Sequence, residues 1–487
     1  MKVSVFAEHS SVLAHWWERR STQPVTLIYL DAHLDLQFVS RARIERLKGC
    51  RTPQQLAALA KPHHLWPDDE FVYSIEDFLY PAAQLGLVKQ LIWVTPPHVD
   101  TNNLQHAFAR LQQMEGIELE ELESFERQPG GWIAGRLLGL ELIICAVETL
   151  NDLPLPNTCL VDIDVDYFIA IPGDAVWVDP KEIFAALNAL PVKLLDVTIS
   201  RSVSSGFTPL RYRFLGDYLA ALWQGDDASV SHFDKLLELD RQLLMGDGSG
   251  IEGACRQELI AYPRCAATWH LLGLAQAGGP EALHSQEEAQ AICADYRPDW
   301  MRSACQIRGR RLATDMAYVL GLEKRISALD VSVAEQAIAW AAAGLLYAVF
   351  HDLERAVECN RHYQLHFGRS HGELGIEIAK LALAGGDAKM AIPYLEAALD
   401  DDESRVTAHV YLAQALASLG KIQEAKKHLQ AAHKLSPAWV ELSGMLASAE
   451  KATGDTCQAE ALLARHHDMR QRTQQLFRRL NIEKPLI

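Results

Sequence analysis

The sequence predicts an α/β domain with a mostly parallel sheet between layers of helices, followed by an all-α solenoid of helical repeats. Up to about residue 225, short β-branched and aliphatic runs alternate with segments long enough to form a helix, a pattern typical of parallel sheets covered on both faces. Beyond this point the strand pattern disappears, and three glycine-led segments recur at a constant interval. We therefore expect an α/β domain at 1–225, a helical connecting region at 226–330 and helical repeats at 331–487.

Six apolar runs are the expected strands of the sheet, because near-continuous apolar runs of this length are typical of strands buried on both faces. They are Val3–Phe6, Val25–Leu30, Gln90–Val94, Leu140–Val147, Thr158–Asp166 and Val192–Ile199. A further short strand is expected at Phe71–Ser74, ahead of a turn. Ligand sites in such sheets lie at the carboxyl ends of the strands, so the residues that follow these runs are candidate functional residues.

An internal repeat organises the C-terminal part of the chain. Gly386, Gly420 and Gly454 are equally spaced, each opens a similar segment, and Ala391, Ala425 and Ala459 stand at the same offset after them. This pattern resembles the tetratricopeptide (TPR) repeat, a helix–turn–helix unit of about 34 residues that stacks into arrays. A degenerate unit begins near His351, and a TPR-like fragment at 267–279 leaves degenerate repeats as an alternative for the connecting region.

Composition excludes several classes of protein. The 46 Lys and Arg against 63 Asp and Glu give a net charge of −17, which disfavours nucleic-acid binding and leaves cationic ligands open. No apolar run reaches the ~18–20 residues of a membrane helix, and the N-terminus lacks a secretory signal pattern. The nine cysteines include no CxxC pair, so we expect neither a disulfide framework nor a thiolate zinc site. We expect a soluble, cytoplasmic protein.

Three clusters of acids and histidines follow predicted strands. They are Glu8-His9, Asp31-Ala32-His33-Leu34-Asp35 and Asp162-Ile163-Asp164-Val165-Asp166. Alternate residues share one side of an extended chain, so carboxylates and an imidazole gather where strands leave the sheet. Partly buried like charges repel one another and need a compensating cation. Nitrogen and oxygen ligands without thiolate suit hard or borderline divalent metals, among which Mn²⁺ fits this set of donors.

These residues resemble the manganese-binding motifs of the arginase (ureohydrolase) superfamily. The EHxxVL start, DxHxDL, SIEDF and DIDxDYF are most similar to the peptide arginases, which convert arginine side chains of ribosomally made peptides to ornithine. The resemblance covers about residues 1–225 and implies an arginase/deacetylase-like fold with two Mn²⁺ ions.

The resemblance also implies two ligand sets, with carboxylates bridging the two ions. The implied ligands of one ion are His9, Asp31, Asp35 and Asp164. The residues implied to complete the other ion's set are His33 and Asp166. Asp162 has no counterpart among the family's core ligands, and we assign Asp162 and Glu8 to supporting roles beside the ligands.

Two features of arginases are missing from this sequence. One is the loop that reads the α-amino and α-carboxylate groups of free arginine, and its absence suits an arginine within a peptide. The other is the glutamate that holds the guanidinium group, since the matching segment, TISRSVSSGFTP, contains no acid. Glu76 or Asp77 in SIEDF is the candidate replacement, with an exposed turn as the alternative reading. His64, beside His63, is the candidate for the arginase imidazole that moves a proton. The candidate substrate-binding residues after the last strand are Ser200, Arg201 and Thr208.

The expected function is manganese-dependent hydrolysis of the guanidinium group of peptidyl arginine, which gives peptidyl ornithine and urea. The repeats are expected to hold the arginine-containing precursor peptide, with homo-oligomerisation through the repeats as an alternative role. If so, deleting the chain after about residue 330 should spare the metal ligands. Two other functions stay open: a deacetylase-like amidohydrolase with one zinc ion, and a non-enzymatic TPR adaptor.

Overall fold

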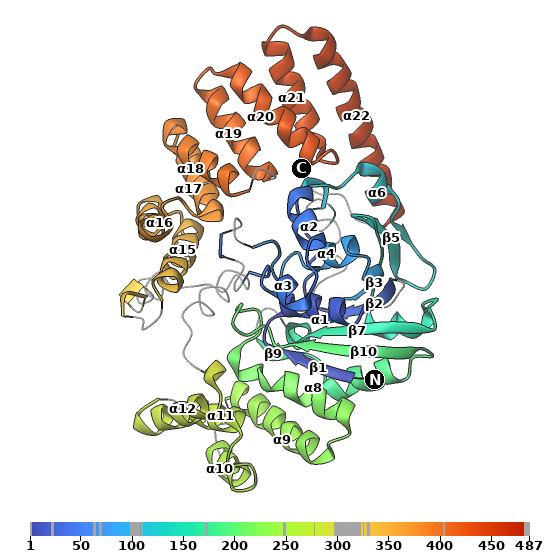
Figure 1. The fold of residues 1–487 in the computed structure, drawn as a ribbon, viewed down its shortest axis with the longest axis vertical. Coiled ribbons are helices and arrows are strands. Elements are labelled where there is room, and N and C mark those ends of the chain that lie inside the picture. Colours follow the sequence, from blue (N-terminus) through green and yellow to red (C-terminus); the bar gives the residue numbers. More distant parts are fainter. Residues whose placement is uncertain are drawn as a thin grey trace.

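The structure, a computed structural model, describes most of the chain. Figure 1 shows an α/β domain and a curved array of helix pairs that returns to this domain at its C-terminal end. The described residues are 2–20, 24–61, 65–67, 71–97, 108, 111–170, 174–246, 250–276, 278–296, 323–324, 326–328, 332–402 and 405–481.

The α/β domain is built on an eight-stranded sheet with the order β1-β10-β7-β2-β3-β6-β5-β4. Neighbouring strands from β1 to β6 in this order are parallel, and β5 and β4 add an antiparallel edge. The strands are β1 (Lys2–Phe6), β2 (Val25–Leu30), β3 (Val88–Val94), β4 (Glu126–Arg127), β5 (Ile133–Leu137), β6 (Leu140–Cys145), β7 (Thr158–Asp164) and β10 (Lys193–Ser200).

Each of the six long runs that the sequence predicts as strands contributes a strand to this sheet, and the mostly parallel sheet is confirmed. The predicted run Leu140–Val147 is too long, because β6 ends at Cys145. The predicted strand at Phe71–Ser74 is wrong, because Tyr73 makes only an isolated bridge to Ala60. Here the Ser74 N–H donates to the Asp77 carboxylate (2.7 Å), which turns the chain toward α4 (Leu79–Gln84). The run at Thr158–Asp166 leaves the sheet after Asp164, where the Asp166 N–H donates to the Asp164 carboxylate (3.2 Å) and a 3-10 turn begins.

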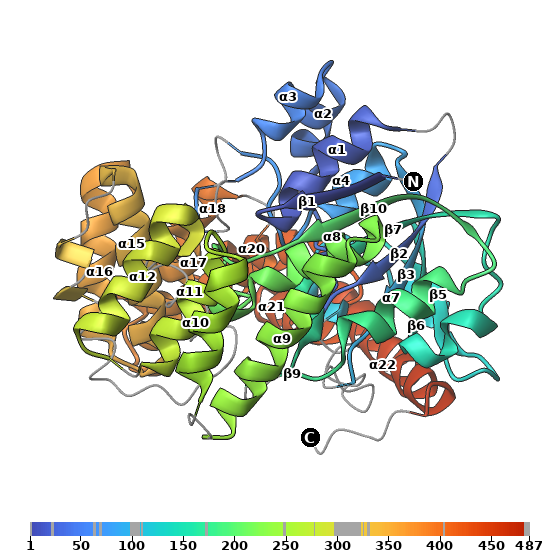
Figure 2. The same ribbon diagram turned by 90° about the horizontal axis from the view of Figure 1, so that it is seen from below.

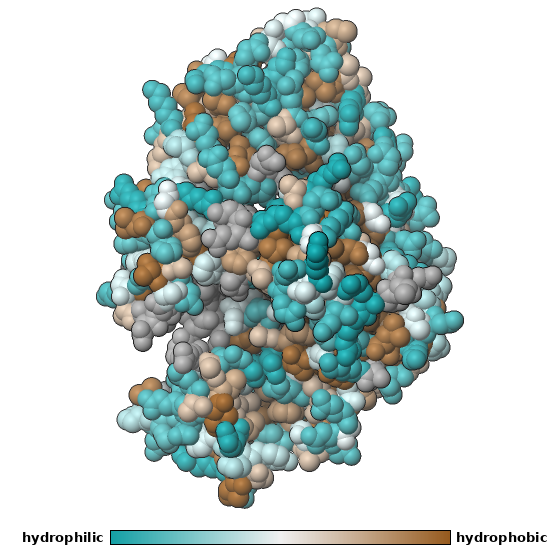
Figure 3. All heavy atoms as spheres, viewed as in Figure 1, coloured by the Kyte–Doolittle hydropathy of each residue, from teal (hydrophilic) through white to brown (hydrophobic). Residues whose placement is uncertain are grey.

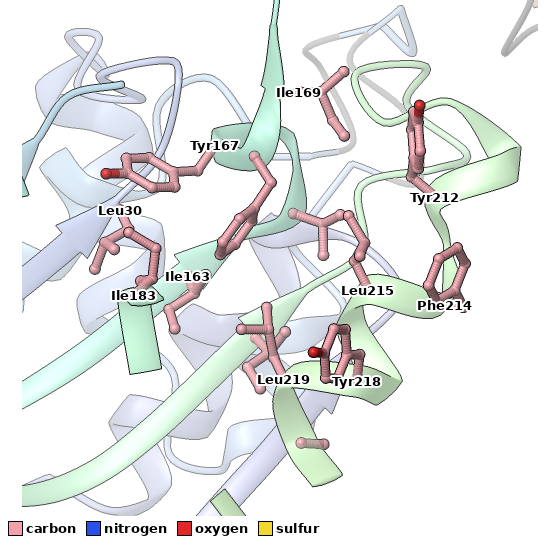
Figure 4. Packing of buried hydrophobic residues seen from close by; sticks show 14 of the residues in the cluster. Leu30, Ile163, Tyr167, Ile169, Ile183, Tyr212, Phe214, Leu215, Tyr218 and Leu219 are labelled. Carbon is pink, nitrogen blue, oxygen red and sulfur yellow. The ribbon is translucent and has the colours of Figure 1, made fainter. Parts of the chain in front are cut away.

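The sheet has a separate apolar core on each face, as the period of two along a strand requires. On β2, Leu27 and Tyr29 pack with α1 (Val12–Glu18), whereas Ile28 and Leu30 pack with helices of the opposite face. Those helices are α7 (Pro180–Asn188) and α8 (Phe214–Gln224), and Figure 4 shows Leu215 and Leu219 of α8 packed toward Ile163 of β7. In Figure 2, α8 lies across β1.

The chain after residue 225 is helical wherever it is described, as the sequence predicts. The first helices are α9 (Asp227–Leu244), α10 (Ile251–Ala261), α11 (Ala266–Ala275) and α12 (Pro280–Ile292). Buried Leu236, Cys255 and Leu271 belong to the same apolar cluster as the α7–α8 face of the sheet. These helices therefore extend the core of the α/β domain.

The later helices form antiparallel pairs joined by short turns. The pairs are α15 (Val333–Val349) with α16 (Leu353–Phe367), α17 (Gly372–Ala384) with α18 (Ala388–Asp401), α19 (Val406–Ser418) with α20 (Ile422–Leu435), and α21 (Val440–Ala452) with α22 (Thr456–Arg479). Viewed from the same side as Figure 1, the surface of this array is mainly hydrophilic (Figure 3).

The repeat glycines lie in the turns within these pairs, and the repeat alanines lie in the cores. Gly386, Gly420 and Gly454 have φ values of +82°, +76° and +94°, a left-handed conformation that costs side-chain-bearing residues free energy. The alanines that follow them in each repeat, Ala391, Ala425 and Ala459, are at most 3 % exposed. Each repeat of the sequence pattern therefore corresponds to one helix pair.

The end of the array packs back onto the α/β domain. Val440 of α21 and Met469 and Leu476 of α22 belong to the same buried cluster as Leu27 of β2. Arg472 of α22 forms ion pairs with Glu120 (2.8 Å) and Glu123 (2.5 Å) of α6 (Leu119–Glu123), and α22 lies beside α6 in Figure 1.

This packing makes the array a structural part of the α/β domain. Deleting the chain after about residue 330 would uncover apolar side chains on the α1 face of the sheet, so the deletion would destabilise the fold that holds the ligands. Within the described residues, no helix is both long and apolar enough to cross a bilayer.

Candidate metal centre

The three acidic and histidine clusters meet at the carboxyl ends of β1, β2 and β7, of which β7 and β2 are neighbours and β1 is separated from β7 by β10. His9 follows β1, Asp31 follows β2, and Asp164 ends β7. From β2 the chain continues through β3 to β6 on one side, then crosses to β7 and β10 on the other. The clusters therefore lie at the switch point of the sheet, where crevices form in parallel sheets.

Three carboxylate oxygens surround one nitrogen of His9. The His9 Nδ1 atom lies 3.0 Å from Asp164 Oδ2, 3.1 Å from Asp31 Oδ2 and 3.3 Å from Asp35 Oδ2. His9 and Asp31 are both 1 % exposed. His9, Asp31 and Asp35 offer ligand atoms close enough together to bind one metal ion.

A second group shares Asp31 with the first. His33 Nδ1 lies 2.8 Å from Asp166 Oδ2 and 3.5 Å from Asp31 Oδ1, and these three residues could hold a second ion. The two Asp31 oxygens thus face different groups. The His33 side chain is 40 % exposed, so this side of the centre is open, with the ring of Phe207 4.8 Å from the imidazole.

The hydrogen bonds of His9 assign its tautomer. Its Nε2 atom lies 2.6 Å from Asp162 Oδ2 and donates to this carboxylate, which also accepts from the Thr198 hydroxyl. In the neutral imidazole the lone pair would be at Nδ1, a buried atom without a hydrogen-bond partner among the described residues. With no metal bound, burial lowers the pKa of His9 but the charges of Asp162 and Asp164 outweigh it and raise that pKa well above its ordinary value. An unpartnered acceptor beside three carboxylates is the arrangement expected of a metal ligand held by an outer carboxylate. The donor set therefore fits a divalent cation.

Further contacts hold the carboxylates in place. The Tyr29 hydroxyl lies 2.5 Å from Asp31 Oδ2 and 2.9 Å from Asp35 Oδ2, and the Ser202 hydroxyl donates to Asp164 Oδ2 (2.5 Å). Asp35 and Ser202 have φ values of +40° and +47°, and such strain collects at functional sites. Sequence reasoning missed Tyr29, Thr198 and Ser202, because tyrosine, threonine and serine are common in any sheet.

Without a cation, the grouped acids resist ionisation. Burial and the charge of Asp31 raise the pKa of Asp35 to about 7 and that of Asp166 to about 6. Burial and the charge of Asp166 raise the pKa of Asp164 to about 7. Burial also opposes ionisation of Asp31, but the nearby imidazoles of His33 and His9 leave its pKa below the usual value. The centre thus carries more carboxylates than its histidines can neutralise.

Glu8 enters the site from the end of β1. Its Oε1 atom accepts from the backbone N–H groups of Ser204 (2.8 Å) and Ser205 (3.3 Å), in the segment after β10. Its buried Oε2 atom has no hydrogen-bond partner among the described residues, and burial raises the pKa of Glu8 to about 7. Glu8 is therefore an acid with a spare oxygen next to His9.

Glu76 and Asp77 line a cavity of about 420 Å³ between the α/β domain and the array. The Asp77 carboxylate accepts from Ser74 N–H, whereas the Glu76 carboxylate accepts no hydrogen bond among the described residues. The cavity also contains Gln37 and Phe38, which follow Asp35 closely in the chain. The array contributes His371, Glu373, Ile376, Asp401, Asp402, Arg405 and Thr407.

The other predicted site residues have different positions. His64 and its neighbour His63 lie outside the described residues. Ser200 and Thr208 are fully buried, and neither hydroxyl has a hydrogen-bond partner among the described residues. Arg201 forms an ion pair with Asp217 of α8.

Comparisons with known proteins concern the repeats. A tetratricopeptide repeat family model matches residues 382–434, and a search of curated proteins finds no match. Among solved structures, that of MamA is 14 % identical with a TM-score of 0.30, covering 36 % of this chain and 96 % of its own.

Two further solved structures are similar. YrrB, described as a TPR protein with an unusual peptide-binding site, is 16 % identical with a TM-score of 0.25, covering 44 % of this chain and 92 % of its own. The Cut9–Hcn1 structure of the APC/C is also 16 % identical, with a TM-score of 0.27 and coverage of 50 % and 48 %. The family model matches residues 382–434, and the chain around them folds into helix pairs. The C-terminal part of the chain is therefore a tetratricopeptide-repeat region.

Proposed function

We propose that this protein is a manganese-dependent hydrolase that converts arginine side chains within a peptide to ornithine and urea. The observation that carries the proposal is the unpartnered His9 Nδ1 atom among three carboxylate oxygens, beside a second group that shares Asp31. A lone pair facing several carboxylates is repulsive unless the imidazole takes up a proton or a metal cation lies between them. The sequence motifs that resemble peptide arginases supply the reaction class.

The proposed division of work follows from the contacts. His9, Asp31, Asp35 and Asp164 would hold one ion, and His33 and Asp166 would complete the other. When bound, a pair of divalent cations supplies an activated water near neutral pH. Asp162 keeps the His9 proton on Nε2, while Ser202 and Tyr29 orient carboxylate oxygens. The exposed side of His33 is the side from which a substrate can approach.

Glu8 is the acid that we propose for the substrate cation. Arginases carry their guanidinium-binding glutamate after the strand that corresponds to β10, where this chain has only neutral residues and Arg201. Backbone N–H groups of that same segment hold Glu8 and leave its Oε2 atom without a partner. A planar guanidinium pairs well with a preorganised carboxylate. Glu8 would thus do the work of the missing glutamate, although the sequence suggests only a supporting role for it.

The repeats would bind the flanking peptide. The cavity begins at Gln37, close to the ligand Asp35, and continues to α17 and α19 of the array. Acidic Glu76 and Glu373 are among its lining residues. A peptide whose reacting arginine lies at the candidate metal centre could therefore place its neighbouring residues against the repeats. Helical arrays commonly bind extended segments in this way.

Two other functions are distinguishable from this one. A deacetylase-like enzyme needs one zinc ion held by Asp, His and Asp, and the second ligand group favours a pair of ions over that arrangement. A non-enzymatic adaptor would use the repeats alone, but it leaves the buried carboxylate cluster without a purpose.

Metal analysis joined to a peptide assay tests the proposal. The purified protein is stripped with a chelator, reloaded with Mn²⁺ or Zn²⁺, and incubated with a capped arginine peptide and with a capped acetyl-lysine peptide. We expect about two Mn²⁺ per chain and a mass loss of about 42 Da for each converted arginine. One zinc with deacetylation would support the deacetylase-like alternative, and neither metal nor turnover would favour the adaptor.

Replacing Glu8 by glutamine should reduce kcat/KM for the arginine peptide by about 30- to 1,000-fold, equivalent to about 2–4 kcal/mol. The amide keeps an acceptor for the Ser204 and Ser205 N–H groups but loses the charge that pairs with the guanidinium. Glu76→Gln is the comparison variant: Glu76 lines the cavity proposed for the flanking peptide, so this change should act on KM and leave kcat within about threefold. The metal content of both variants is measured in parallel. The opposite ranking would assign the guanidinium to Glu76.

A further inference from the structure

A second cluster of reactive side chains lies in helices α9 to α11, away from the candidate metal centre. His232 of α9 places its Nδ1 atom 2.7 Å from Glu258 Oε2 of α10 and its Nε2 atom 3.3 Å from Cys265 Sγ. Cys265 is the N-terminal cap of α11. The order thiol, imidazole, carboxylate is that of an activated nucleophile, in which the acid orients the base and the base takes the thiol proton.

The surroundings of Cys265 favour its ionised form. Burial opposes ionisation, but hydrogen bonds with His232 and Thr268 lower the pKa of the thiol below its ordinary value. The positive end of the α11 dipole acts in the same direction. His232 shows the matching change, since its contacts with Cys265 and Glu258 outweigh burial and raise its pKa. In contrast, burial raises the pKa of Cys145, Cys159 and Cys255.

Access and rigidity complete the arrangement. Cys265 is partly exposed, whereas the His232 side chain is only 3 % exposed and is stacked on Tyr262 at 4.0 Å. The imidazole is therefore fixed beside a residue that is open in part to solvent. Other titratable groups near the thiol are Tyr262, on the loop before it, and Tyr296, which follows α12.

We propose that Cys265 is a nucleophilic thiolate that reacts with small peroxides, with His232 as its proton partner and Glu258 as the positioning residue. The sulfur attacks one peroxide oxygen, so that an S–O bond forms and the O–O bond breaks. Sulfur loses two electrons to the peroxide, and the departing hydroxide takes the imidazolium proton from His232 and leaves as water. The product is a sulfenic acid, which thiols can reduce again. This chemistry is independent of the metal centre.

Alkylation with iodoacetamide between pH 5 and 9, read for each cysteine by peptide mass spectrometry, tests the proposal. Cys457, exposed on α22, is the internal control. We expect the labelling of Cys265 to reach half its maximum rate at least about one pH unit below Cys457. His232→Gln should move this midpoint up to that of Cys457, and Glu258→Gln should move it part of the way. The pH at which labelling reaches half its maximum rate depends on the ionisation of each thiol. The difference in exposure between Cys265 and Cys457 changes the maximum rate but not this pH.

A second experiment, with hydrogen peroxide, tests the proposed reaction itself. The wild-type protein is treated with hydrogen peroxide and dimedone, and we expect sulfenic acid to form at Cys265 at least about ten times faster than at Cys457. Cys265→Ser should remove this product and leave the signal at Cys457. Circular dichroism checks that the variants are folded. Equal midpoints for the two cysteines, an unchanged profile in a folded His232→Gln or Glu258→Gln protein, or equal peroxide rates would overturn the proposal.

Discussion

Replacing Asp31 by asparagine is expected to abolish turnover and to prevent the protein from binding its full complement of metal. Asp31 is the one residue shared by the two ligand groups, and its two oxygens face His9 and His33 separately. An amide presents one oxygen and no charge, so one ion would lose its Asp31 ligand and the other would keep only a weaker, neutral one. Losing an outer partner of a metal ligand costs about 10–100-fold in affinity, and we expect this substitution to exceed that.

Asp196→Asn is the matched control for this experiment. Asp196 is also a buried carboxylate on the sheet, but it accepts from His15 (2.7 Å) and Arg19 (3.0 Å) away from the ligand groups. We expect this variant to retain its metal. Metal content after chelation and reloading is measured for both proteins, together with peptide turnover. A chelator-washed Asp31→Asn enzyme with full activity would refute the metal-centre interpretation.

The second large effect is expected where the array joins the α/β domain. Leu476 of α22 is 1 % exposed and is packed in the cluster that contains Leu27 of β2. Leu476→Ala would leave a cavity in this shared core and should lower the free energy of unfolding by about 2–5 kcal/mol. Leu463, on the same helix but 43 % exposed, should tolerate alanine within about 0.5 kcal/mol.

Urea unfolding followed by tryptophan fluorescence separates these outcomes. If α22 completes the core, Leu476→Ala should lower the unfolding midpoint of the α/β domain as well as that of the repeats. A shift confined to the repeats would mean that the array folds independently, and the deletion after residue 330 would again be a reasonable experiment.

The sequence predicts the architecture well because its two periodicities are strong. Buried parallel strands such as Val25–Leu30 are apolar throughout, and the glycine turns recur at a constant interval from Gly386 to Gly454. The antiparallel edge formed by β4 and β5 was missed because short edge strands carry little apolar pattern. Docking of α22 was also missed, since its buried positions are typical of any amphipathic helix.

The sequence likewise predicts some residues of the candidate site and not others. Ligand motifs at i, i+2 and i+4 concentrate acids where sheets rarely hold them, and the structure brings all six predicted ligands together. Glu8 was harder to judge because its position depends on Ser204 and Ser205, which lie far from it along the chain. Contacts of that kind leave no local signal. The Cys265, His232 and Glu258 cluster was hidden for the same reason, since its members lie on three different helices.

The packing of α22 against the sheet also governs the order of events during synthesis. Domains generally fold as they emerge from the ribosome, N-terminal parts first. Here the last of the proposed metal ligands to be made is Asp166, yet the apolar cluster that contains Leu27 is complete only after Leu476 has been made. Until α22 is made, the nascent chain therefore carries a core face that is only partly covered. Such long-range closure slows folding, so we expect this protein to depend on chaperones until α22 has emerged from the ribosome.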